Sequence, residues 1–149
     1  MKVYFIFNIK EEFKKLYQGN ERILFSVLKQ IYYLDKNEII IGYNLFSQLT
    51  NPINKIELDR NIFIKYHTDI PYSKKGHIHY INNLYKNEIS RLEIKRSYIK
   101  LELEQKNSAF FSILNVFSKN LFVCDFTNQD YFFIIPEKNK NYKTIKTTI

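Results

Sequence analysis

The sequence predicts a single α/β domain in which helices pack against a mixed β-sheet. Short segments rich in Ile, Phe and Tyr predict strands near both ends of the chain, and apolar residues at helical spacing predict helices. The chain of 149 residues has the length of one domain. We expect that domain over residues 1–136, followed by a basic, frayed tail over 137–149, which has four lysines, one glutamate and almost no core-forming pattern.

The first third of the chain predicts a strand followed by two helices. Residues 3–8 form an apolar run typical of a strand, and apolar residues then recur at helical spacing up to Gly19. Asn20 is a candidate N-cap for the second helix. Phe25 and Tyr32 lie on another face of that helix, which therefore packs on two sides or presents aromatic rings outward. Its predicted core stripe consists of Ile23, Leu24, Val27, Leu28 and Ile31.

The middle of the chain has an ambiguous pattern. Residues 39–41 are three isoleucines, which favour a strand, but Leu45, Phe46 and Leu49 fit a helix that ends before Pro52. We favour the helix. Further on, the pattern predicts a short strand over 62–66 and a turn at Pro71.

The second half predicts strands and one more helix. Strands are expected over 77–81, 89–95 and 98–104, and the last two alternate apolar with charged residues, as half-exposed strands do. Ser108 is a candidate cap for a helix to about Lys119, with Phe110, Ile113, Leu114 and Phe117 on its apolar face. The apolar runs 121–126 and 131–135 predict a hairpin at the centre of the sheet.

The net charge of +8 is compatible with an acidic or anionic partner. Lysine is abundant while alanine occurs once, a bias expected of an AT-rich genome whatever the function. The lysines are spread over nearly every segment and no aromatic RNA-binding motif is present. A basic nucleic-acid-binding module therefore remains the alternative, and direct binding to nucleic acid is the less favoured hypothesis.

The sequence favours the cytoplasm as the location. Cys124 is the single cysteine, so an intramolecular disulfide is impossible. The apolar run near the N-terminus is too short for a signal peptide and leads into Lys10 and Glu11. No uncharged apolar stretch approaches the ~20 residues of a membrane span.

The residue types that carry chemistry form no familiar pattern, and we expect no enzyme, cofactor or metal. The three glycines are scattered and cannot form a phosphate-binding loop. His77 and His79 would lie on one side of a strand, with His67 or Cys124 as a third ligand, but histidines on a sheet are the simpler interpretation. Cys124 lies within an apolar run and is interpreted as a core residue rather than a nucleophile.

Two ends of the chain carry distinctive residue strings. The first consists of Tyr4, the run from Ile9 to Phe13, Tyr17 and Gly19, and the second of Asp125, Phe126, Tyr131 and Pro136. These residues resemble the SirA family, the sporulation inhibitors of replication. The Asn51, Pro52, Ile53 segment and the Lys75, Gly76, His77 turn also fall where similar family residues would.

The resemblance implies a non-enzymatic inhibitor that binds the N-terminal domain of DnaA, the initiator ATPase. It implies that the first helix contributes Phe13 and Tyr17 to the binding surface, although both could simply pack on the sheet. A second contribution is expected from the segment before Pro52. There the chain has Leu45 where the family has a polar residue, with Gln48 one turn on.

Overall fold

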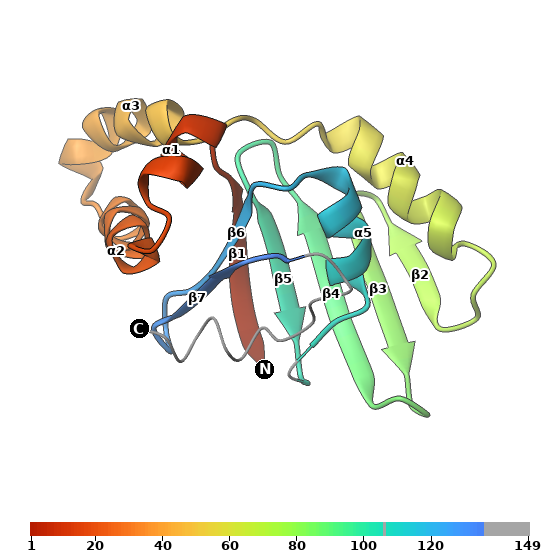
Figure 1. The fold of residues 1–149 in the computed structure, drawn as a ribbon. Coiled ribbons are helices and arrows are strands. Elements are labelled where there is room, and N and C mark those ends of the chain that lie inside the picture. Colours follow the sequence, from red (N-terminus) through yellow and green to blue (C-terminus); the bar gives the residue numbers. More distant parts are fainter. Residues whose placement is uncertain (106, 136–149) are drawn as a thin grey trace.

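The fold is a seven-stranded sheet with helices on both faces, seen in a computed structural model that describes residues 1–105 and 107–135 (Figure 1). The strand order is β2-β3-β4-β5-β1-β6-β7. The strands are β1 (Lys2–Asn8), β2 (Tyr72–Lys75), β3 (Ile78–Asn83), β4 (Glu88–Ile94), β5 (Ile99–Leu103), β6 (Leu121–Asp125) and β7 (Asp130–Phe133). The helices are α1 (Glu11–Leu16), α2 (Glu21–Tyr32), α3 (Ile39–Leu49), α4 (Lys55–Tyr66) and α5 (Phe110–Phe117), with a 3₁₀ turn, η1 (Lys36–Glu38), before α3.

The predicted fold class, an α/β domain with helices against a sheet, is confirmed. Every strand pairing among the described residues is antiparallel, so the expected mixture of strand directions is wrong. The β6–β7 hairpin lies at one edge of the sheet, next to β1, and not at its centre. Both faces of this hairpin are covered, each by a different core. Its residues are therefore apolar on both faces, as in a central strand, and this pattern led to the wrong position.

Strand β1 divides the interior into two cores. Successive side chains of a strand point to opposite faces, and here both faces are apolar. Tyr4 and Ile6 belong to the first core, whereas Phe7 and Ile9 belong to the second. The predicted strand over 3–8 is confirmed as the strand on which the two layers meet.

The first core lies between the sheet and the helices α4 and α5. Leu58 and Ile62 on α4 and Leu114 on α5 are fully buried against the apolar residues of β1, β4 and β5. The strand predicted over 62–66 is wrong, because these residues complete α4. The helix begins at Asn54, whose side-chain oxygen accepts a hydrogen bond from the Glu57 amide at 3.2 Å, as an N-cap does.

The second core lies on the opposite face, under α2, and is largely aromatic. Phe25 stacks on Tyr131 and Phe126, with ring centroids 4.7 and 5.6 Å apart. The buried residues of α2 are Leu24, Phe25 and Leu28, while Ile23 is exposed. The predicted stripe is thus correct for Leu24 and Leu28 and wrong for Ile23, because Phe25 takes the helix face that turns to the sheet.

Helix α3, favoured from the sequence, is confirmed and packs against α2. Gly42 leaves room for the Leu34 side chain, which follows α2, since a Cβ atom at position 42 would collide with Leu34 Cδ1. Asn20 occupies the N-cap position of α2 without a side-chain capping bond. The Glu21 carboxylate instead accepts a hydrogen bond from the Gly19 amide at 2.8 Å.

The rest of the described chain follows the predicted order. Strands β4 and β5 alternate buried and half-buried residues, as expected. Ser108 Oγ accepts a hydrogen bond from the Phe110 amide at 3.2 Å at the start of α5. Strand β2 was not predicted, and it forms the edge of the sheet beside β3, opposite the β7 edge. The tail over 137–149 lies outside the described residues.

The different burial of Phe25 and Ile23 predicts different stabilities for their alanine variants. Phe25→Ala removes two ring stacks and leaves a cavity, so it should lower the free energy of unfolding by about 3–5 kcal/mol. Ile23→Ala truncates an exposed side chain on the same helix and should cost less than about 1 kcal/mol. Urea unfolding followed by circular dichroism measures both values. Equal losses would contradict the orientation of α2.

Candidate functional site

Helices α1 and α3 are held beside each other by the backbone (Figure 1). The Lys10 amide, just before α1, donates a hydrogen bond to the Leu49 carbonyl at the end of α3, at 2.9 Å. The Asn51 amide donates to the Asn8 carbonyl at 2.8 Å. The start of α1 and the end of α3 therefore form one fixed corner of the molecule.

Phe13 and Tyr17, the residues predicted to bind a partner from α1, are both half-buried. They lie one helical turn apart and pack against the second core without being enclosed by it. Between them in sequence, Leu16 is 64% exposed. Packing on one side leaves each aromatic ring with a free edge and restricts its rotation.

Leu45 and Gln48, the residues predicted from α3, are both exposed. With Ile41 they follow the spacing i, i+4, i+7, which places all three on one face of the helix. Other exposed apolar residues of α3 are Ile39, Ile40 and Tyr43. Helix α3 therefore offers much more apolar surface to solvent than a helix that only supports the sheet.

Lys14 on α1 is turned back towards the sheet. Its ammonium group donates a hydrogen bond to the Lys119 carbonyl at 2.6 Å and lies 5.4 Å from the centre of the Phe133 ring. These contacts fix α1 over the β6–β7 hairpin. These contacts of Lys14 help to hold Phe13 and Tyr17 at a defined place relative to the sheet.

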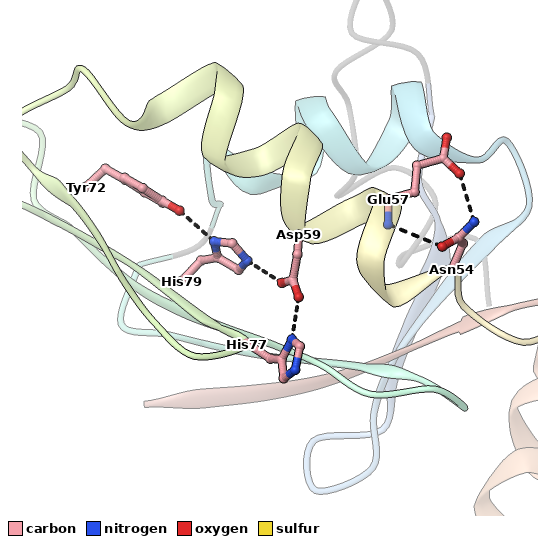
Figure 2. Close-up of polar contacts among 6 residues, drawn as sticks. All are labelled: Asn54, Glu57, Asp59, Tyr72, His77 and His79. Carbon is pink, nitrogen blue, oxygen red and sulfur yellow. Dashed lines mark hydrogen bonds and ion pairs between the residues drawn. The ribbon is translucent and has the colours of Figure 1, made fainter.

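His77 and His79 converge on one carboxylate that sequence reasoning missed (Figure 2). Asp59 of α4 accepts a hydrogen bond from His79 Nε2 at 2.8 Å through Oδ1, and its Oδ2 contacts His77 Nδ1. The hydroxyl oxygen of Tyr72, on β2, lies 2.7 Å from His79 Nδ1. This chain of four side chains ties α4 to β2 and β3.

The network determines the protonation of His79. A carboxylate can only accept, so Nε2 carries the proton and Nδ1 accepts from the Tyr72 hydroxyl. Burial lowers the pKa of His79 below 6.5, an effect that the hydrogen bond to Asp59 partly opposes. Burial and the Asp59 charge raise the pKa of Tyr72 to about 12. Both rings are therefore neutral at pH 7.

The metal-site alternative receives no support from these contacts. Both ring nitrogens of His79 have protein partners, and His67 lies at the end of α4 with Nδ1 bound to the Phe63 carbonyl. Over residues 1–105 and 107–135, no three His, Cys, Asp or Glu side chains are grouped to hold a metal ion. Cys124 is fully buried, and burial raises the pKa of its thiol.

An apolar cavity of about 320 Å³ lies between α2, α3 and the start of β5. Its wall includes Leu28, Tyr32, Gly42, Tyr43 and Tyr98. No carboxylate, histidine, lysine or arginine of the described chain lines it. A cavity of this composition has no group for acid–base chemistry near pH 7.

The buried His79 predicts a loss of stability on acidification. Its pKa is lower in the folded than in the unfolded state, so the unfolded chain binds more protons once the pH falls below about 6.5. The free energy of unfolding should then decrease by up to about 1.4 kcal/mol per pH unit through this residue. Above pH 6.5 the effect disappears.

Urea unfolding between pH 7.5 and 5.5 tests this, with His79→Gln as the variant that cannot titrate. The groups that face His79 are Asp59, Tyr72, Lys74 and His77, and all are kept in this variant. His79→Gln should show a smaller pH slope than wild type. An unchanged slope in His79→Gln would contradict the assignment.

Comparison with known proteins identifies the family. The family model described as "Sporulation inhibitor of replication protein SirA" matches residues 2–138. No curated protein matches the sequence significantly. In the part of the chain that the structure describes, no helix is long and apolar enough to cross a membrane. The resemblance seen in the opening segment is confirmed, and the chain belongs to the SirA family of sporulation inhibitors of replication.

Proposed function

We propose that this protein inhibits the initiation of replication by binding the N-terminal domain of DnaA, without catalysing a reaction. The family membership supports a regulator of replication. The observation that carries the proposal further is the fixed corner between α1 and α3, made by the Lys10–Leu49 and Asn51–Asn8 backbone hydrogen bonds. It presents half-buried aromatic residues of one helix next to exposed apolar residues of another.

Phe13 and Tyr17 have the properties of interface anchors. Interface energy concentrates in a few residues, among which tyrosine is enriched. A ring that already packs on the second core loses little conformational freedom when a partner covers its other edge. Leu16, on the same helix and largely exposed, would add apolar area beside them.

Helix α3 supplies the second half of the proposed surface. Leu45 is an exposed apolar residue, so this contact relies on apolar burial, with Gln48 as the hydrogen-bonding group. Ile41 extends the same face by one turn. An interface of standard size buries about 800 Å² on each partner, which α1 and α3 together have the length to supply.

A mechanism by occupation needs no reactive group in this chain. The candidate nucleophile Cys124 is enclosed in the second core, and the pKa of about 12 keeps the Tyr72 hydroxyl protonated. Binding alone removes DnaA from productive assembly at the origin in proportion to the complex formed. Inhibition should therefore follow the concentration of the protein relative to DnaA and show no turnover.

Calorimetry of the full chain with the DnaA N-terminal domain from the same organism tests the proposal. Wild type should form a one-to-one complex, and Tyr17→Ala should weaken it by about 2 kcal/mol or more. Tyr85→Ala is the matched control, because Tyr85 is a fully exposed tyrosine in the β3–β4 turn, on another part of the sheet. It should bind like wild type.

Two results would overturn the proposal. The first is the absence of binding by folded wild-type protein. The second is equal weakening by Tyr17→Ala and Tyr85→Ala. Repeating the titration at two salt concentrations with a DNA duplex in place of DnaA examines the alternative function, since phosphate contacts lose affinity steeply as salt rises.

A further inference from the structure

The outer face of α4 carries apolar side chains that the fold does not use. Ile56, Arg60, Phe63 and His67 follow the spacing i, i+4, i+7, i+11, which aligns them on one side of the helix. Ile64 lies next to this line. Ile56 is 77%, Phe63 44% and Ile64 61% exposed. We call these five residues the α4 outer face.

The orientation of this face is determined by the opposite side of the helix. Leu58 and Ile62 are fully buried in the first core, and the Tyr66 hydroxyl donates to the Ala109 carbonyl at 3.0 Å. Asp59 is held by His77 and His79 (Figure 2). Helix α4 cannot rotate to bury its outer residues without breaking these contacts, so they remain available to a partner.

Phe63 is held in one orientation before any partner arrives. The His67 ring stacks on it with centroids 4.9 Å apart and planes at 18°. His67 is itself tied to the helix end, since its Nδ1 lies 2.9 Å from the Phe63 carbonyl and 3.2 Å from that of Ile64. An aromatic side chain ordered in this way loses little entropy on binding.

The charge of the α4 outer face is positive and centred on Arg60. Arg60 makes no ion pair with any described residue. The nearby acid, Glu57, accepts a hydrogen bond from the Asn54 side chain at the N-cap. An exposed guanidinium between Ile56 and Phe63 selects a carboxylate, because it can bind both oxygens at once.

We propose that the α4 outer face is a second interaction surface, which binds an amphipathic helix whose apolar side chains are flanked by Asp or Glu. Apolar anchors at helical spacing fit a helical partner, and the exposed Arg60, which pairs with no acid of the described residues, specifies its charge. A second copy of this chain is a poor fit, because the net charge is +8 and each copy brings its own Arg60. Nucleic-acid bases could stack on Phe63 but would leave the exposed aliphatic side chains of Ile56 and Ile64 without matching contacts.

This surface does not depend on the proposed DnaA contact. The α4 outer face is anchored on the first core, whereas Phe13 and Tyr17 pack on the second. The protein would then have two independent protein-binding faces.

Fluorescence anisotropy of the full chain with a designed, labelled helical peptide tests the proposal. The peptide has about 18 residues, or five turns, with Leu and Phe on one side and Glu beside them. Arg60→Glu and Phe63→Ala should each weaken binding about tenfold or more. Arg22→Glu, at an exposed arginine on α2, and Tyr17→Ala should bind like wild type, which separates this test from that of the DnaA contact.

Several outcomes would overturn the proposal. One is the absence of peptide binding, and another is equal binding of a peptide in which Lys replaces Glu. A dimer in sedimentation velocity that Phe63→Ala dissociates would assign the face to self-association. A DNA oligonucleotide that competes with the peptide and loses affinity in Arg60→Glu alone would assign it to nucleic acid.

Discussion

The burial of β1 on both faces is the constraint on which the rest of the structure depends. Its odd and even side chains enter different cores, so the chain must supply a helical layer for each face. Helices α4 and α5 cover one face and α2 covers the other, with α1 and α3 attached at the end of β1 (Figure 1). The positions of both proposed binding faces follow from this division.

Sequence patterns predicted most of the elements where burial and periodicity agree. The alternation in β4 and β5 and the spacing in α2 and α5 are of this kind. The prediction was wrong where a segment has more apolar residues than the core buries. Ile62, Phe63 and Ile64 suggested a strand because they are consecutive apolar residues. All three belong to α4, and of these three only Ile62 is buried. The Asn54 to Glu57 capping spacing was the local signal that marked the helix start.

One part of the candidate site was predictable from the sequence and another part was not. Phe13 and Tyr17 came from the family resemblance, since their pattern alone also fitted packing on the sheet, and both rings do pack on the second core while remaining half-buried. The meeting of Asp59 with His77 and His79 was not predictable. It depends on α4 crossing β3 in space, and no local spacing in the sequence records such a tertiary contact.

The edge of the sheet formed by β2 has a consequence for behaviour at high concentration. Among the strands of the described residues β2 pairs with β3 alone, so its other side presents backbone groups of the kind that in many proteins recruit a strand from a neighbouring molecule. Here the edge strand is only four residues long and ends in Lys74 and Lys75. Two such edges repel each other, which disfavours the pairing of β2 with the β2 of a neighbouring molecule.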